Sequence, residues 1–195
     1  GLLLLPNLIG EHPHHGVFLP GSVDRAVQSL DGLICESEQE GRRYLSRFEL
    51  LKKPQEIPIA LYNEHSLDKD LDFILAPIKN GERWGLVSDC GLPCIADPGY
   101  KLVARARIIG INIQAFVGPS SILLSLMLSG LPAQKFFFHG YLEKEENLRL
   151  NAITRLEKQS KQEGATQVFI EAPYRNMHML DSLLKVLGEE TLLCV

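Results

Sequence analysis

The stretch Val87–Gly99, which reads VSDCGLPCIADPG, decides the fold class of this chain. It overlaps the end of a short apolar run, Trp84–Val87, and precedes a segment in which apolar residues recur at helical spacing, Tyr100–Ile109. Open α/β sheets bind ligands at such places, where a strand ends in a loop before a helix. Gly91 lets a ligand approach the backbone, and the prolines of the loop fix φ and stiffen it before anything binds. The stretch therefore predicts an α/β fold with a preformed small-molecule site.

Short apolar runs alternate with helical patterns along the whole sequence. Strands are expected at Leu2–Leu5, Gly32–Cys35, Ile57–Tyr62, Trp84–Ser88, Ile111–Val117, Phe136–Tyr141, Thr166–Glu171 and Thr191–Val195. Two helices are expected to begin at an N-cap, one at Ser22 and one at Asp97, and the second of these ends near Gly110. Further helices are expected at Glu38–Phe48, Leu67–Ile78, Ile122–Leu128, Glu143–Glu163 and Pro173–Leu187. This alternation is typical of mostly parallel sheets covered by helices. We expect two small α/β domains, residues 1–117 and 118–195.

Composition narrows the class of protein. With 45% hydrophobic and 23% charged residues, the chain matches a globular protein with a real core. A net charge of −4 gives no broad basic field for nucleic acid or membrane, although a local patch could still bind RNA. No apolar run reaches the roughly 20 residues of a membrane helix, and Leu2–Leu5 is too short for a signal peptide. We expect a cytoplasmic protein that does not associate with membranes.

The four cysteines, Cys35, Cys90, Cys94 and Cys194, show no CxxC spacing and predict free thiols in a reducing compartment. The chain lacks an initiator Met and stops in the apolar run Leu192–Val195. We therefore expect the C-terminal domain to be truncated at its end.

Common catalytic and phosphate-binding templates are missing. The sequence has no GxxxxGK[ST], no GxGxxG after the first strand and no GxSxG. His12, His14 and His15 have no acidic or cysteine partner at a known metal-ligand spacing, so no metal site is expected.

Four loops that contain proline or glycine follow predicted strands: Pro6–Gly10, Ser88–Gly99, Gly118–Ser121 and Glu171–Arg175. In parallel sheets all four would lie at the carboxyl edges, where they could enclose a ligand cleft. Asp89 could equally well contact a ligand or cap its loop, and Glu171 could equally well contact a ligand or cap a helix. Asp97 is best explained as the N-cap of the helix that follows it.

These loops resemble motifs of one known family. Residues 86–99, LVSDCGLPCIADPG, resemble LVSDAGTPxIxDPG, and residues 117–121 with 129–132 resemble PGPSAxxxALxxSGLP. Residues 138–142, FHGYL, are similar to FxFxGFLP, and residues 169–175, FIEAPYR, to FYESPHR. The chain thus resembles the tetrapyrrole methylase family of S-adenosylmethionine-dependent methyltransferases, closest to its branch that methylates a ribose 2′-hydroxyl of small-subunit ribosomal RNA. Two motifs depart from that branch: Pro6–Pro13 replaces PTPIGNLxDIT, and Glu36–Gln39 replaces EDTR.

The resemblance implies two α/β domains with S-adenosylmethionine in the cleft between them, and a homodimer. Ser88, Asp89, Cys90, Gly91, Leu92 and Ile95 would hold the amino-acid part and ribose of the cofactor, and Pro6 would join them. Ser120 and Ser121 would hold a polar edge of the cofactor. The adenine would be flanked by Phe169, Ile170, Glu171 and Ala172. The second domain would close over the cofactor at Tyr141 and Leu142.

No catalytic residue is assigned, although Asp89 and Glu36 are candidates for a general base. The expected substrate is ribosomal RNA or the small ribosomal subunit. The alternatives are a methyltransferase of a tetrapyrrole or other small molecule, and a non-catalytic dimer that binds the cofactor.

Overall fold

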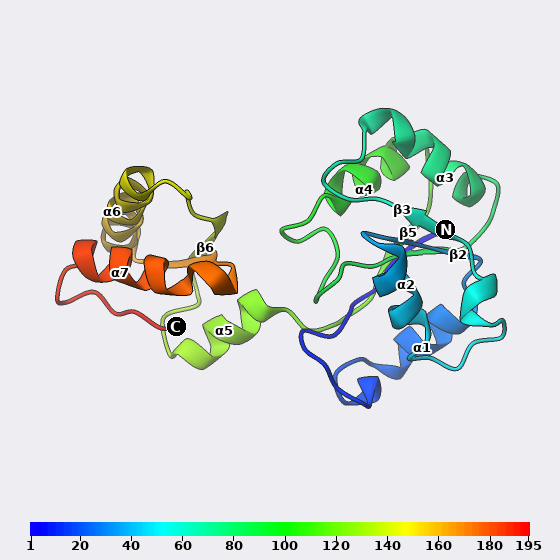
Figure 1. The fold of residues 1–195 in the computed structure, drawn as a ribbon, viewed down its shortest axis with the longest axis horizontal. Coiled ribbons are helices and arrows are strands. Elements are labelled where there is room, and N and C mark those ends of the chain that lie inside the picture. Colours follow the sequence, from blue (N-terminus) through cyan, green and yellow to red (C-terminus); the bar gives the residue numbers. More distant parts are fainter. The chain divides into compact units, whose positions relative to one another are not determined.

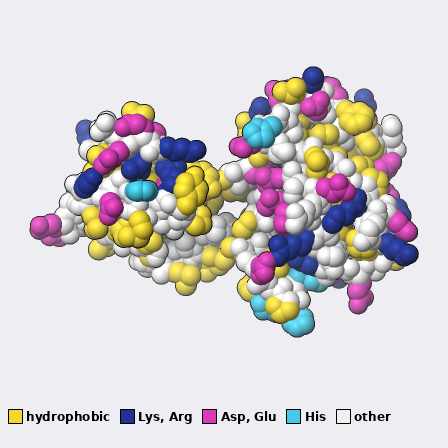
Figure 2. All heavy atoms as spheres, in the orientation of Figure 1, with side chains coloured by type: hydrophobic (Ala, Val, Ile, Leu, Met, Phe, Trp, Pro, Cys, Tyr) yellow, Lys and Arg dark blue, Asp and Glu magenta, His cyan; other side chains and the backbone are white.

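The computed structural model describes residues 1–195, which form two compact units, Gly1–Ser121 and Ile122–Val195 (Figure 1). The sequence placed a boundary just before Gly118, whereas the loop from Gly118 to Ser121 belongs to the first unit of the structure. None of the helices is long and apolar enough to cross a membrane. Acidic and basic side chains are interspersed over the visible face of each unit (Figure 2).

The first unit is built on a parallel five-stranded sheet, as the sequence predicted. Its strands are β1 (Leu2–Leu4), β2 (Gly32–Cys35), β3 (Ile59–Leu61), β4 (Trp84–Leu86) and β5 (Ile113–Ala115), in the order β3-β2-β4-β1-β5. Every ladder in this sheet is parallel, so all five strands end at the same edge. Strands β4, β1 and β5 are neighbours, which places the loops that follow them side by side.

Helices cover both faces of this sheet. They are α1 (Gly21–Gln28), α2 (Glu38–Leu45), α3 (Leu71–Lys79) and α4 (Gly99–Ile108), with 3-10 turns at His15–Val17, Pro54–Glu56 and Asp68–Asp70. Successive strand residues point to opposite faces, so Leu33 packs with Val27 of α1 and Leu45 of α2, whereas Ile34 packs with Leu75 of α3 and Leu102 of α4. Burial on both faces explains why these strands are continuous apolar runs and do not alternate with polar residues.

Gly32 at the start of β2 is required by the packing of the sheet. A Cβ at this position would overlap the six-membered part of the Trp84 indole on the neighbouring strand. We expect Gly32→Ala to lower the free energy of unfolding by about 1–3 kcal/mol, because the indole or the strand must move to relieve the overlap. Urea unfolding checks this, with Gly16→Ala as the control because no atom lies within 4 Å of a Cβ there. Equal stability of the two variants would contradict the packing argument.

The second unit is smaller and has a two-stranded sheet. It comprises α5 (Ser121–Ser129, which begins at the boundary), β6 (Phe136–Tyr141), α6 (Glu146–Glu163), β7 (Thr166–Ile170), the 3-10 turn Pro173–Arg175 and α7 (Asn176–Val186). Strands β6 and β7 pair in parallel, and the buried core consists of Leu142, Ile153, Met179 and Leu183.

Several expectations about the elements and their ends were wrong. Thr191–Val195 is not a strand, because no other strand pairs with it, and its first residue bonds instead to the Glu157 carboxylate of α6. Helix α1 starts at Gly21 with Pro20 as N-cap, so Ser22 lies inside the helix. Helix α6 starts at Glu146, because the Glu145 carboxylate accepts the amides of the first turn.

Candidate functional site

Three of the four predicted loops meet at the carboxyl edge of the first unit's sheet. Asn7 N donates to Gly91 O at 2.7 Å, and Gly91 N donates back to Leu8 O at 3.3 Å. The Cys90 thiol donates to Ile9 O at 3.4 Å. The loop after β1 and the loop after β4 are thus joined through their backbones.

The loop after β5 packs against both of the others at glycines. A Cβ on Gly118 would overlap the ring of Pro6 and lie 3.4 Å from Leu92 Cδ2. A Cβ on Gly91 would lie 3.4 Å from Pro119 O. Absent side chains therefore allow the three backbones to approach one another.

The loop after β4 holds an unusual backbone conformation. Gly91, Cys94 and Ala96 have φ values of +70°, +70° and +59°, and for the last two this is the left-handed region that side chains disfavour. The Asp97 carboxylate stabilises it by accepting Cys94 N at 3.0 Å and Gly99 N at 2.6 Å. Asp97 was predicted to be the N-cap of α4, but Pro98 occupies that position, and Asp97 closes the loop one residue earlier. Such strain is concentrated at binding sites in proteins, where it preorganises the backbone.

Two further carboxyl groups lie at this edge, those of Glu36 and Asp89. Glu36 directly follows β2, and its Oε1 accepts Ser88 Oγ at 3.3 Å and Asp89 N at 3.4 Å. Burial is the main cause that raises the pKa of Glu36, and it also raises the pKa of Asp89, with further contributions from Glu40 and Asp97. Crowded carboxylates that are partly removed from water favour a cationic ligand, because its charge relieves their repulsion.

The cysteines of this loop are not activated. All four cysteines of the chain are free, as predicted, and burial raises the pKa of Cys94 to about 12 and that of Cys90 above its usual value. Both are thiols near neutral pH, so they provide no thiolate nucleophile.

The candidate residues of the second unit also form a group. Tyr141 pairs in register with Ile170, and Phe169 packs against the core that contains the buried Leu142. Glu171 Oε1 accepts Ala172 N at 2.8 Å. Sequence reasoning had left Glu171 as a ligand contact or a helix cap, and its Oε1 bonds the amide of the residue that follows it.

Arg175 joins the ends of β6 and β7. Its Nη2 lies 3.0 Å from Glu171 Oε2 and donates to Leu142 O at 3.4 Å and to Glu143 O at 3.3 Å. The contact with Oε2 has the distance of an ion pair but not the alignment of a hydrogen bond, since that oxygen is buried without a hydrogen-bond partner.

The remaining predicted positions make fewer contacts. Ser120 and Ser121 stand at the start of α5 without hydrogen bonds to the other loops, and Ile95 is half-exposed. Sequence reasoning missed Asn7 and Arg47, whose side chains are bonded to each other. Nothing local in the sequence marks Arg47, whereas Asn7 is a polar residue right after a buried strand and could have been singled out.

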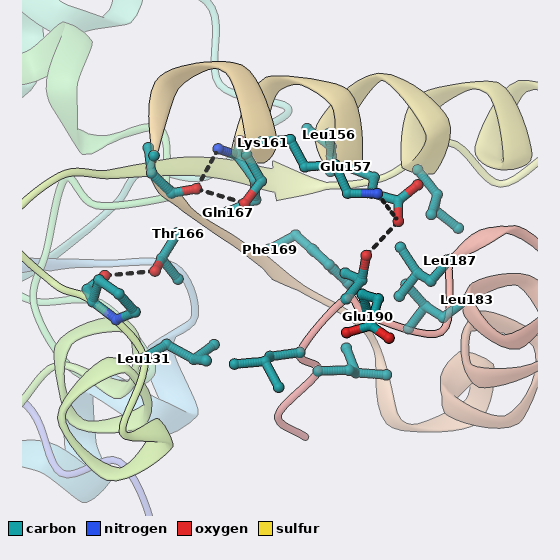
Figure 3. A pocket seen from close by; sticks show the side chains of 18 residues that line it. Leu131, Leu156, Glu157, Lys161, Thr166, Gln167, Phe169, Leu183, Leu187 and Glu190 are labelled. Carbon is teal, nitrogen blue, oxygen red and sulfur yellow. Dashed lines mark hydrogen bonds and ion pairs between the residues drawn. The ribbon is translucent and has the colours of Figure 1, made fainter.

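The second unit also contains a cavity of about 350 Å³ (Figure 3). Helices α6 and α7, strand β7 and residues 190–193 line it, with Phe169, Leu183 and Leu187 among its apolar walls. Glu157 stands at its edge and holds the segment after α7: its Oε1 accepts Thr191 Oγ1, Gly188 N at 2.9 Å and Lys161 Nζ at 3.0 Å.

These bonds make the second unit sensitive to acid. The hydrogen bond from Thr191 is the main cause that lowers the pKa of Glu157 to about 2, followed by the Gly188 amide and Lys161. Because the pKa of Glu157 is depressed in the folded state, its carboxylate adds stability at pH values above the usual pKa of 4.5. This stability is lost as the pH falls from 4.5 through about 2.

We expect Glu157→Gln to flatten the decline of the urea midpoint over this pH range. Glu189→Gln, an exposed carboxyl without a partner, is the control, and an unchanged pH slope for Glu157→Gln would contradict the assignment.

Comparison with known proteins gives one consistent group of relatives, although no protein-family model matches the chain. Ribosomal RNA small subunit methyltransferase I of Thermotoga maritima is 32% identical over 165 residues, which cover 85% of this chain and 70% of that protein. The protein of the same name from Mesorhizobium japonicum is 34% identical over 169 residues, covering 85% of this chain and 54% of its own length. The chain spans about half the length of this and several other curated relatives that it matches.

Proposed function

The chain belongs to the ribosomal RNA small subunit methyltransferase I family, and we propose that its first-unit loops hold S-adenosylmethionine for methyl transfer to small-subunit ribosomal RNA. The observation that carries this proposal is the convergence of three loops after β1, β4 and β5 through backbone bonds and glycine contacts. Neighbouring parallel strands place such loops where α/β proteins bind nucleoside ligands.

The residues present fit this cofactor. S-adenosylmethionine carries a sulfonium and an ammonium group, and a nearby cation would stabilise the charged form of Glu36 and Asp89, whose pKa values are raised mainly by burial. The absence of side chains at Gly91 and Gly118 lets the three loops lie close enough together to contact one ligand. The first-unit contacts that we propose are Pro6, Ser88, Asp89, Cys90, Gly91, Leu92, Ile95, Ser120 and Ser121. The second-unit residues Tyr141, Leu142, Phe169, Ile170, Glu171 and Ala172 stay predictions that rest on the resemblance.

The protein has a limited chemical task in this reaction. The bound sulfonium supplies an electrophilic methyl group, and the stiff loops would fix its direction. Alignment alone can provide effective molarities on the order of 10⁵ M or more. A group that accepts the proton of the ribose 2′-hydroxyl would assist the reaction, and a carboxyl with a raised pKa is a stronger base than an ordinary one. We propose Glu36 and Asp89 as the two groups to test as general base.

Two measurements test the proposal. Native mass spectrometry and calorimetric titration should detect S-adenosylmethionine or its demethylated product on the purified chain. Transfer of tritiated methyl groups to small ribosomal subunits, followed by nucleoside analysis, should yield a 2′-O-methylated nucleoside. Label in a porphyrin fraction would favour a tetrapyrrole substrate, and binding without transfer to either acceptor would favour the non-catalytic dimer. Light scattering on the same sample tests the proposed homodimer.

A further inference from the structure

Asn7 is a buried polar side chain that connects two of the proposed cofactor loops. Only 4% of it is exposed, and its Nδ2 donates to Ser88 O at 2.9 Å and to Asp89 O at 3.0 Å. These two carbonyls belong to the first residues of the loop after β4. Asn7 thus fixes the direction of the peptide groups with which that loop begins.

The amide oxygen of Asn7 also accepts two hydrogen bonds. Asn7 Oδ1 accepts Leu8 N at 2.8 Å and Arg47 Nη1 at 2.7 Å. A flipped amide would direct its hydrogens at these two donors and its oxygen at two carbonyls, so the network allows one orientation only. Arg47 is therefore the one side chain among the four groups that fix which way Asn7 faces.

Arg47 lies in the turn after α2 and has no acidic partner, which distinguishes it from the arginines on α2. Arg42 pairs with Glu38, and Arg43 pairs with Glu11 and Glu40, whereas no carboxylate lies within ion-pair distance of Arg47. Its charge is directed at a neutral amide oxygen, which makes that hydrogen bond stronger than a neutral one. Tyr44, one turn earlier, donates to Pro6 O at 3.2 Å. The end of α2 and the turn after it thus hold the loop after β1 at two successive residues, Pro6 and Asn7.

We infer that Asn7 and Arg47 are positioning residues that set the cofactor-binding geometry of the Ser88–Leu92 backbone. This inference rests on the proposed function, and it concerns a feature of this chain, because Asn7 stands where the pattern PTPIG of the resembling branch has threonine. Threonine has no pair of amide hydrogens and cannot donate to both carbonyls. The charged hydrogen bond from Arg47 to the Asn7 amide therefore governs how the neighbouring loop is presented.

A double-mutant cycle tests the inference. The variants are Arg47→Gln and Asn7→Thr, alone and together, and the probe is S-adenosylhomocysteine in calorimetric titration. We expect Arg47→Gln to weaken binding about tenfold when Asn7 is present, and less than about twofold when threonine replaces it. Arg107→Gln, an exposed arginine without an ion pair on α4, should leave binding unchanged. Urea unfolding of each variant shows whether loss of binding follows from loss of the fold.

Two outcomes would overturn the inference. Equal weakening by Arg47→Gln in both backgrounds would mean that Arg47 acts on the ligand by its charge and not through Asn7. Unchanged binding in the Asn7 background would remove both residues from any positioning role. If the wild-type chain does not bind the probe, the proposed function fails. Amide hydrogen exchange then tests separately whether Arg47 holds the two loops in place through Asn7. Arg47→Gln should accelerate hydrogen exchange at the amides of Leu8 and Gly91. If these amides are as well protected in Arg47→Gln as in Arg107→Gln, the positioning role of Arg47 is rejected.

Discussion

Replacing Arg175 by methionine is expected to lower the free energy of unfolding of the second unit by about 3–5 kcal/mol. Only 11% of the Arg175 side chain and 7% of the Glu171 side chain are exposed, so the substitution leaves a buried carboxylate without its cation. Arg175 also donates to the carbonyls of Leu142 and Glu143 at the end of β6, and these acceptors would lose a partner. Because whole domains are stable by only about 5–15 kcal/mol, this loss would be a large fraction of the stability of the unit.

The controls separate the buried pair from ordinary surface pairs. Lys185→Met removes an exposed ion pair with Glu146 at 2.7 Å and should cost less than about 1 kcal/mol. Adding Glu171→Gln to Arg175→Met removes the unpaired charge and should restore part of the stability. Urea unfolding followed by hydrogen exchange of second-unit amides measures all three. A cost below about 1 kcal/mol for Arg175→Met, with no gain from Glu171→Gln, would show that the pair does not support the unit.

The architecture of the first unit could be predicted because its signal is local. Runs such as Gly32–Cys35 are apolar on both faces, and they alternate with helical patterns, which is sufficient to indicate a parallel sheet. Thr191–Val195 is similarly apolar, yet it forms no strand. A strand needs a partner from elsewhere in the chain, and residue composition does not say whether one is present.

The site could be predicted only in part, for a related reason. Glycines and prolines mark the three loops because their effects on the backbone act at a single residue. The side-chain bonds that hold the loops join residues far apart: Arg47 and Asn7 are 40 positions apart, and Glu36 and Ser88 are 52 positions apart. A single sequence does not indicate which distant residues form such pairs. The resemblance to a family identified the loops but not the bonds particular to this chain.

Gly91→Val is expected to weaken binding of S-adenosylmethionine by at least about tenfold, or about 1.4 kcal/mol. Gly91 has a φ of +70°, which costs an ordinary residue about 1–2 kcal/mol and a β-branched one more. Its Cβ would lie 3.4 Å from Pro119 O, and the methyl groups of valine would extend toward that carbonyl. The backbone would have to move at the residue that exchanges hydrogen bonds with Asn7 and Leu8, and the peptide groups proposed to hold the cofactor would move with it.

A matched control separates this effect from general backbone strain. Gly110, which follows α4, has a similar φ of +78°, but no atom lies within 4 Å of a Cβ there. Gly110→Val should therefore lower the free energy of unfolding through strain alone and leave cofactor affinity unchanged. Calorimetric titration with S-adenosylmethionine, beside urea unfolding of both variants, makes the comparison. If Gly91→Val stays folded and binds as tightly as Gly110→Val, the loop after β4 does not contact the cofactor, because a contact made through its backbone could not survive this change.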